Sequence, residues 1–511
     1  MSFAKIKSSG LLGIDGYIVD VQTDISNGMP AFEIVGLPDA AVKEAKERIR
    51  SAIKNIGSVF PGKRIIINLA PADCKKEGSV YDLPMAVSIL VATEQIRCEN
   101  IEEFAFVGEL SLDGGVSSVT GVLPMVISLY NNGIKNIFVP YDNASEAAVI
   151  EGCSVYPVKS LKDVIEHFTT DKKIQKHTVD VNGLFSDNYQ ALLDFCDVKG
   201  QESVKRAIEV AAAGNHNILL IGSPGTGKTM LAQRISSILP DLSFDEALEV
   251  TKIHSISGEL KKGMPIIAKR PFRHPHHTIS PQGLSGGGSV PKPGELSLAH
   301  NGVLFLDELP EFRRDVLEVM RQPLEDGTVT ISRVNSTLSY PCNFMLVASM
   351  NPCKCGYLGD ANRNCTCTEN QITKYRSKIS GPLLDRIDIQ VEVENVNYDD
   401  LSSTQKCEHS RDIKKRVDAA RKIQLERYKN HSIYSNSELD AGLLQEFCEL
   451  GENENKILRA AFDNLGLSAR AHSRILKVAR TIADLEQSEN ITVAHLAEAI
   501  QYRSLDRKFF K

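Results

Sequence analysis

The sequence predicts an α/β protein in three parts, whose central core is a parallel sheet with helices on both faces. Three observations support this fold class. A glycine-rich loop lies between an apolar strand and a helical pattern within residues 218–239, which is the local order of a doubly wound core. Two later apolar runs end in polar or acidic side chains, as parallel strands do at the binding edge of a sheet. From about residue 400 onward the apolar spacing is helical.

The length and composition allow several large cores and exclude some classes of protein. A chain of 511 residues with 42% hydrophobic residues is long enough for roughly three domains. The net charge of -6 argues against a globally basic nucleic-acid binder, although a local basic surface or ring channel is compatible with it. The N-terminus has no signal pattern and no apolar run is long enough to span a membrane. We therefore expect a cytoplasmic protein without membrane partners, and the odd number of 11 cysteines does not suggest a disulfide framework.

The pattern along the chain divides it into segments. RIIINLAP (64–71) and FAFVGELSL (104–112) are typical of strands, whereas residues 40–57 have the spacing of an amphipathic helix that Gly57 can cap. Long amphipathic helical runs occupy 410–428 and 469–485. We predict an N-terminal α/β domain at 1–168, a polar linker at 169–190, the core at 191–393 and a helical lid domain at 394–511.

The glycine-rich loop fits the phosphate-binding motif G-x-x-x-x-G-K-[ST] in full. The glycines let backbone N–H groups close around phosphate oxygens, and the following helix adds partial positive charge. Lys228 would reach the terminal phosphates of ATP, and the Thr229 hydroxyl would hold Mg²⁺. The predicted nucleotide-binding residues are Gly222, Ser223, Pro224, Gly225, Thr226, Gly227, Lys228 and Thr229.

A second element of the phosphate site follows the apolar strand 303–306, which ends in Asp307 and Glu308. Asp307 would orient the shell of Mg²⁺, and Glu308 would act as general base on the attacking water. Many strand ends carry acidic residues, so this pair alone is weak evidence for a nucleotide site. It indicates such a site because a complete phosphate loop precedes it in the chain.

Three further polar positions have two interpretations each. Asn351 ends the strand FMLVASMN and is either a residue that holds the attacking water or an ordinary turn asparagine. Arg386, in GPLLDRID, either acts in trans on the ATP of a neighbouring subunit or forms a surface salt bridge. Arg470, with Arg474 one turn later, either reaches phosphate or belongs to a solvated basic face.

Two clusters contain residues that bind metals. Four cysteines match a structural zinc site, although their C-x-C spacing is tighter than the usual C-x-x-C. The alternative is four reduced surface thiols, an arrangement prone to oxidation. The histidines of RHPHHT indicate either a metal site or a rigid structural or pore loop. The candidate ligands are Cys353, Cys355, Cys365 and Cys367 for zinc, and His274, His276 and His277 in the second cluster.

Long stretches of the chain resemble one family. FRHPHHTISPQGLSGGGSVPKPGELSLAHNGVLFLDELPEF (272–312), INLAPADCKKEGSVYDLPMAV, MNPCKCG and SGPLLDRIDI are similar to the ComM/YifB family, within the magnesium-chelatase-like clade of AAA+ ATPases. The resemblance covers nearly the whole chain. It implies inserts near 251–295 and a hairpin near 326–342 that line the pore of a ring, and it favours the structural or pore-loop role for the histidines. The implied roles are Walker A at Lys228 and Thr229, Walker B at Asp307 and Glu308, sensor one at Asn351, an arginine finger at Arg386 and sensor two at Arg470.

The N-terminal segment resembles the proteolytic domain of Lon. Lon-type proteases need a Ser-Lys dyad, but Ser79 does not align with the nucleophile, which falls nearer Val80 or Tyr81. The helix expected to supply the lysine, VTGVLPMVISLY, contains none. We therefore expect a non-catalytic platform for DNA or for ring assembly.

The resemblance implies a hexameric, ATP-driven DNA helicase or translocase that promotes branch migration during natural transformation. Its partners would be single-stranded or branched DNA, further copies of the chain and recombination proteins. The alternatives are a motor subunit for metal insertion into a porphyrin, an ATP-dependent protease and a non-enzymatic scaffold. DNA-stimulated ATPase activity favours the first, whereas dependence on porphyrin or casein favours the next two. Salt-sensitive DNA binding would draw on the locally basic C-terminal residues Arg470, Arg474, Lys477, Arg480, Arg503, Arg507, Lys508 and Lys511.

Overall fold

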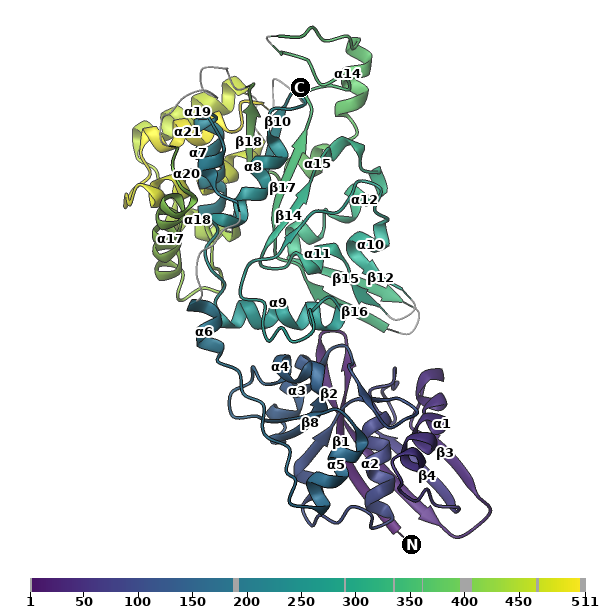
Figure 1. Ribbon diagram of the computed structural model, residues 1–511. Coiled ribbons are helices and arrows are strands. Elements are labelled where there is room, and N and C mark those ends of the chain that lie inside the picture. The colour runs from purple at the N-terminus through teal and green to yellow at the C-terminus, as the bar shows by residue number, and fades with distance from the viewer. Residues whose placement is uncertain are drawn as a thin grey trace. The chain divides into compact units, whose positions relative to one another are not determined.

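The chain forms two compact units in the computed structural model (Figure 1). Unit 1 comprises Met1–Asp187 and Phe244–Ala268, and unit 2 comprises Asn188–Ser243 and Lys269–Lys511. Residues 244–268, which the sequence pattern assigns to the central core, thus pack with the N-terminal residues. The structure describes residues 2–186, 193–288, 291–333, 336–360, 362–395, 407–465 and 468–505.

Unit 1 is built on a mixed seven-stranded sheet with the order β3-β4-β2-β1-β5-β8-β9. The long strands β1 and β2 pair antiparallel, as do β2 and β4, while β5, β8 and β9 are parallel. The helices and strands of this unit are β1 (Ser2–Leu12), β2 (Asp15–Ser26), β3 (Ala31–Val35), α1 (Ala40–Asn55), β4 (Arg64–Ala70), α2 (Asp82–Ala92), β5 (Phe104–Phe106), β6 (Glu109–Leu110), β7 (Val116–Ser117), α3 (Val122–Asn131), β8 (Asn136–Pro140), α4 (Ala144–Ala147), β9 (Ser154–Val158), α5 (Leu161–Thr169), α6 (Val181–Ser186) and α9 (Phe244–Ser257).

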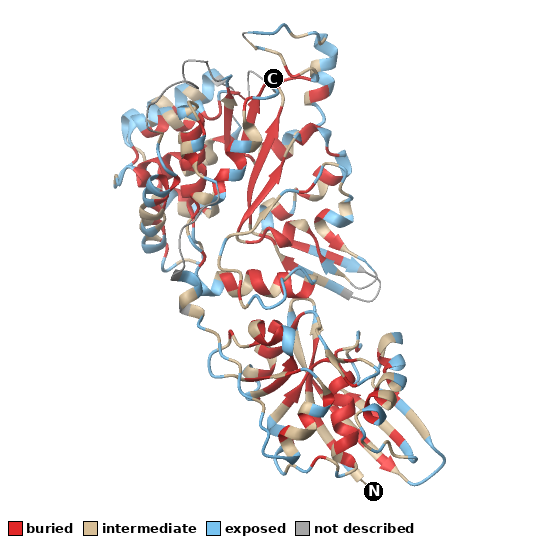
Figure 2. Ribbon diagram, in the orientation of Figure 1, coloured by how far each residue is buried: buried red, intermediate tan, exposed pale blue. Residues whose placement is uncertain are grey.

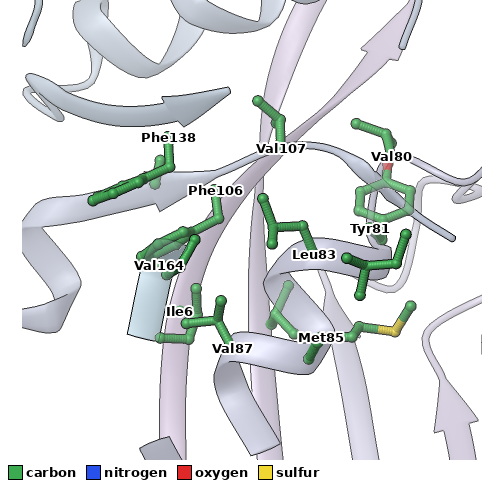
Figure 3. Close-up of a cluster of buried hydrophobic side chains, with 14 of the residues drawn as sticks. Ile6, Val80, Tyr81, Leu83, Met85, Val87, Phe106, Val107, Phe138 and Val164 are labelled. Carbon is green, nitrogen blue, oxygen red and sulfur yellow. The ribbon is translucent and has the colours of Figure 1, made fainter. Parts of the chain in front are cut away.

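The core of unit 1 lies where the buried helix α2 packs against the sheet. Figure 3 shows Val87 of α2 beside Ile6 of β1 and Phe106 of β5, and all three are fully buried. The rings of Phe106 and Phe138 stack with their centroids 4.8 Å apart. The prediction of a single strand at 104–112 is wrong. Gly108 donates to the Val80 carbonyl and accepts from the Leu83 N–H, so this residue pairs with the start of α2 and the strand divides into β5 and β6.

Helix α9 joins unit 1 through polar and apolar contacts. It packs on α3, and the N–H of Gly121 donates to the Ser255 carbonyl at 3.0 Å. The Ser255 hydroxyl donates to Glu146 Oε2 at 2.6 Å, and burial raises the pKa of Glu146. The α9 segment is therefore part of the interior of unit 1.

Unit 2 is built on a parallel five-stranded sheet with the order β11-β14-β17-β10-β18. Figure 2 shows the central strands buried, because helices cover the sheet. The elements up to the last strand are α7 (Glu202–Gly214), β10 (Ile218–Gly222), α8 (Lys228–Arg234), β11 (Phe272–Arg273), α10 (Pro281–Ser285), β12 (Gly286–Gly287), β13 (Lys292–Pro293), α11 (Glu295–Leu298), β14 (Val303–Leu306), α12 (Arg314–Val319), α13 (Pro323–Asp326), β15 (Thr328–Arg333), β16 (Ser336–Pro341), β17 (Met345–Met350), α14 (Glu369–Arg376), α15 (Gly381–Leu384) and β18 (Ile389–Val393). Strands β15 and β16 form an antiparallel hairpin, as expected near 326–342.

Helices follow the sheet, as the apolar spacing predicts. The runs at 410–428 and 469–485 are confirmed as α17 (Ser410–Arg427) and α20 (Ala469–Leu485), with α18 (Ala441–Phe447), α19 (Glu452–Leu465) and α21 (Val493–Gln501) beside them. Ser468 caps α20 by accepting from the N–H of Ala471, and α20 packs against α7, α17 and α21. Among the described residues, no helix has both the length and the apolar character that a bilayer span requires.

Candidate nucleotide-binding site

The phosphate-binding loop joins β10 to α8 at the carboxyl edge of the parallel sheet. Gly225 and Gly227 have φ of +85° and +87°, which favour glycine because a side chain is strained in the left-handed region. A Cβ at Gly222 would clash with the carbonyl oxygen of Val393 on β18. The glycines of the motif are thus required by the turn and by its close packing on the neighbouring strand.

Lys228 is the first residue of α8 and its side chain folds back over the loop. Its Nζ donates to the carbonyls of Gly222 at 2.8 Å and Ser223 at 2.9 Å, and to Asn351 Oδ1 at 3.2 Å. Burial lowers the pKa of Lys228 to about 8, although the carboxylates of Asp307 and Glu308 act in the opposite direction. The structure therefore brings the predicted lysine and the predicted sensor asparagine into direct contact.

The acidic residues after β14 face the other end of the loop. The Thr229 hydroxyl donates to Asp307 Oδ2 at 2.8 Å, and the Ser349 hydroxyl donates to Asp307 Oδ1. The N–H of Glu308 donates to Ser349 Oγ at 3.2 Å. Thr229 and Asp307 are thus placed as a pair of oxygen ligands of the kind that Mg²⁺ prefers.

Ser349 is a site residue that sequence reasoning missed. It is fully buried in β17, within the otherwise apolar run MLVASM. A hydroxyl inside a buried strand needs a hydrogen-bond partner, and this signal was available in the sequence. The partner itself becomes visible only once β17 is known to pair with β14.

Glu308 combines exposure with a strained backbone. Its φ of +53° lies in the left-handed region, where residues other than glycine are uncommon. Its side chain is exposed, next to the half-buried Asp307. Such strain is frequent at functional sites, where the surrounding structure holds a side chain in a required position.

Arg386 and Arg470 lie at the opposite edge of the sheet, before the strands begin. Both line a cavity of about 730 Å³ together with Asn217, which precedes β10. Arg386 donates to the Pro382 carbonyl at 2.7 Å and pairs with Glu325. Its Nε is buried with no hydrogen-bond partner among the described residues. The structure thus separates the predicted site residues into two groups, with Lys228, Asp307, Glu308 and Asn351 at one edge and Arg386 and Arg470 at the other.

Arg470 and Arg474 share this cavity but differ in their surroundings. Arg474 donates to Asp388 Oδ1 at 2.9 Å, and only 17% of its side chain is exposed. Arg470 is 62% exposed and lies 3.7 Å from the carboxylate of Asp385. Of the two, Arg470 is the arginine available to a group that enters the cavity.

The other described residues of the C-terminal basic block are committed to internal contacts, contrary to the expectation of a basic surface. Arg480 is buried against Asp484, and Arg503 is buried and donates to the Ile387 carbonyl. Lys477 donates to the Ser437 carbonyl at 2.8 Å, and burial lowers its pKa. These cations stabilise the helical region because they satisfy buried carbonyls and carboxylates. Arg507, Lys508 and Lys511 lie outside the described residues.

The four cysteines predicted to bind zinc meet in one loop after β17. The sulfur of Cys353 lies 3.4 Å from that of Cys355 and 3.6 Å from that of Cys365, and Cys355 and Cys365 are 3.5 Å apart. With Cys367 included, all four sulfurs lie within 4.8 Å of one another. This donor set fits a tetrahedral zinc ion.

The predicted histidine cluster is arranged differently. The ring of His274 packs on Phe305 with centroids 4.7 Å apart, and His276 Nδ1 lies 2.9 Å from the Thr278 hydroxyl. Within the described ranges, groups able to hold a metal occur at the four cysteines and at Asp194, Cys196 and His409, not at these histidines. Asp194 has a structural role of its own, because it accepts from the N–H groups of Cys196 and Ser410.

Ser79, the candidate nucleophile of the N-terminal segment, has a carboxylate as its hydrogen-bond partner. The Ser79 hydroxyl donates to Glu109. Val80 and Tyr81, the two residues nearer the aligned nucleophile position, are both buried, and a Cβ on Gly10 would clash with the Tyr81 hydroxyl. This arrangement is not a Ser-Lys dyad.

Family models match three stretches that cover most of the chain. The model for "Magnesium chelatase, subunit ChlI" matches residues 194–401, which include the four residues at the carboxyl edge and Arg386 but not Arg470. "Subunit ChlI of Mg-chelatase" matches 21–143, and the corresponding C-terminal model matches 407–503.

Whole-chain relatives identify the family. The competence protein ComM of Haemophilus influenzae is 42% identical over 99% of this chain and 98% of its own length. The chain belongs to the ComM/YifB family. The YifB proteins of Salmonella typhimurium and Escherichia coli are each 44% identical, also over 99% of this chain and 98% of their own. A magnesium-chelatase 38 kDa subunit of Rhodobacter capsulatus is 25% identical over 31% of this chain. The ComM/YifB core is thus a magnesium-chelatase-like AAA domain, which implies ATPase activity.

Proposed function

We propose that this protein is an ATP-driven ring motor on DNA that promotes branch migration of recombination intermediates. The observation that carries the ATP-driven part is the prebuilt phosphate site, where Lys228 contacts Asn351 and Thr229 contacts Asp307. Support for the DNA part comes from a relative of full length that is named a competence protein. Integration of incoming DNA during natural transformation is the corresponding process.

The carboxyl edge of the sheet supplies the hydrolytic chemistry. ATP with Mg²⁺ provides the phosphoryl group and its charge compensation. Lys228 would neutralise the terminal phosphates, while Thr229 and Asp307 would hold the metal shell. Asn351 positions the attacking water, and Glu308 accepts its proton.

The two arginines at the other edge support a ring. Arg386 and Arg470 lie before the strands, so the sheet of their own subunit separates them from Lys228. An arginine that stabilises charge on a transferred phosphoryl group must approach it closely. Both arginines therefore act on the nucleotide of a neighbour in a homo-hexamer, through a head-to-tail interface that closes on itself. In the proposed ring, the hairpin β15–β16 and the insert near residues 251–295 face the pore and contact the DNA backbone.

Two other functions are less well supported. The chelatase family models favour a motor subunit for metal insertion. The ComM relative, however, is 42% identical over 99% of this chain, whereas the magnesium-chelatase 38 kDa subunit is 25% identical over 31% of it. A protease is disfavoured because Ser79 pairs with Glu109. Porphyrin-dependent or casein-dependent ATPase activity would favour these functions instead.

The experiment is ATP hydrolysis by the purified protein with and without single-stranded and forked DNA. We expect DNA to stimulate hydrolysis, and Lys228→Ala to abolish it by preventing phosphate binding. Glu308→Gln should retain ATP but slow hydrolysis by about 10²–10⁴-fold, the range for loss of a general base. An ATPase that is indifferent to every DNA tested would contradict the DNA motor, and the porphyrin and casein reactions would then decide between the alternatives.

A further inference from the structure

The cysteine loop lies directly against the phosphate-binding loop. It begins two residues after Asn351, and Gly356 packs so closely on Pro224 that an added Cβ would lie 2.5 Å from the proline Cδ. Gly356 has a φ of +87°, which bends the chain between Cys355 and the next turn. A side chain at this position is therefore excluded by the contact with the phosphate loop.

The two loops also approach each other at Asp360. Its carboxylate accepts from Asn395 Nδ2 at 2.8 Å and from the N–H groups of Asn362 and Arg363 at 2.8 and 3.1 Å. The nearby Ser223 side chain lowers the pKa of Asp360 to about 2. The cysteine loop thus packs on Pro224 and approaches Ser223, two residues of the predicted nucleotide site.

The cysteine cluster closes the loop around those contacts, because Cys353 and Cys355 precede Gly356 while Cys365 and Cys367 follow Asp360. Zn–S bonds of about 2.3 Å in a tetrahedron place the sulfurs about 3.8 Å apart, close to the separations in the cluster. The backbone N–H groups of Cys355 and Cys367 also donate to the sulfurs of Cys367 and Cys365, at 3.3 and 3.4 Å. Such second-shell donors are typical of metal-bound thiolates.

We propose that Zn²⁺ bound by Cys353, Cys355, Cys365 and Cys367 braces the phosphate-binding loop and thereby sets the affinity for nucleotide. The inference rests on the proposed ATP site. Ordering a loop costs backbone conformational entropy for each residue that becomes fixed. With zinc bound, the loop that supports Ser223, Pro224 and Asn351 is ordered before nucleotide arrives. Without zinc, nucleotide binding must order it.

The test measures zinc content and nucleotide affinity in the full-length chain. The variant Cys365→Ser with Cys367→Ser removes two ligands that lie beyond the contacts with the phosphate loop. Zinc is measured by elemental mass spectrometry, and affinity by titration with a fluorescent ADP analogue. The matched control is Cys98→Ser with Cys153→Ser, two half-buried cysteines of unit 1. We expect one zinc per chain in the wild type and the control. The Cys365/Cys367 variant should lose zinc and bind the analogue roughly tenfold more weakly, since the entropy of ordering about one residue corresponds to that factor.

A second variant tests the approach of the two loops while it leaves the four metal ligands in place. Asp360→Ala should keep its zinc and still bind the ADP analogue more weakly. If the cysteine variant does not fold, chelation of zinc from the wild type, followed by addition of zinc back, gives the same comparison. Absence of zinc from the wild type, or equal affinity with and without zinc, would overturn the brace and leave the proposed function intact. Failure of the wild type to bind nucleotide at all would overturn both.

Discussion

At the scale of single residues, the surroundings of Lys228 in the nucleotide site lower its pKa. Burial among the carbonyls of its own loop lowers the pKa from 10.5 to about 8. The charged form, which binds phosphate, is present below about pH 8 and is lost as the pH rises through that value. We predict that affinity for the fluorescent ADP analogue falls between pH 7 and pH 9.

Lys228→Arg provides the control for this effect. Arginine stays charged throughout this range, so whatever affinity the variant retains should be independent of pH. The same decline in the variant and in the wild type would show that another group titrates.

Asp307, Glu308 and Lys228 could be predicted from the sequence because each belongs to a short contiguous pattern. A glycine loop after an apolar strand determines its own local geometry. Ser349 was missed because its partner is 42 positions away in the chain, across two strands whose pairing is a tertiary fact. The contrast between Arg470 and Arg474 also depends on packing, since the two arginines lie one turn apart on the same helix.

At the scale of elements, helix α20 is joined to the sheet by a buried polar network. Asp388, just before β18, accepts from Arg474 of α20 and lies 3.5 Å from the ring of His216. His216 Nε2 lies 2.8 Å from the Thr481 hydroxyl on the same helix. Burial acts to raise the pKa of Asp388, but Arg474, His216 and Lys477 hold it well below the ordinary value.

This network predicts different outcomes for two arginines one turn apart. Arg474→Ala leaves the Asp388 carboxylate buried without its main partner, which costs about 3–5 kcal/mol. Arg470→Ala removes only an exposed ion pair, worth about 0–1 kcal/mol, yet it should abolish most ATP hydrolysis. Urea unfolding followed by circular dichroism, beside an ATPase assay, measures both effects. Equal loss of stability in the two variants would contradict the assignment of Arg474 to structure and Arg470 to function.

The elements themselves were largely predictable. The helices α17 and α20 and the strands β10, β14 and β17 follow from apolar spacing. Spacing does not indicate which sheet a helix will cover. For this reason the sequence pattern places α9 in the central core, whereas the helix packs on α3 in unit 1.

At the scale of the whole molecule, the two edges of the parallel sheet predict shared active sites. A subunit with Arg386→Ala keeps its phosphate loop, and a subunit with Lys228→Ala keeps its arginine. Each variant alone should be inactive. In an equimolar mixture, roughly a quarter of the head-to-tail interfaces combine an intact loop with an intact arginine, so ATPase activity should reappear at about that level. Mixtures that stay inactive under conditions of subunit exchange would indicate that Arg386 acts within its own subunit.

The excursion of Phe244–Ala268 into unit 1 also bears on how this protein can be divided. The chain passes between the units near residues 187, 243 and 268, so no single cut releases an intact N-terminal fragment. A gene truncated after residue 187 would encode the sheet of unit 1 without helix α9, whose Ser255 hydroxyl donates a hydrogen bond to Glu146. The second piece, which begins after residue 187, would contain α9 but not helix α3, on which α9 packs. Fragments intended for separate study therefore need residues 244–268 grafted onto the first piece and a short loop in their place in the second.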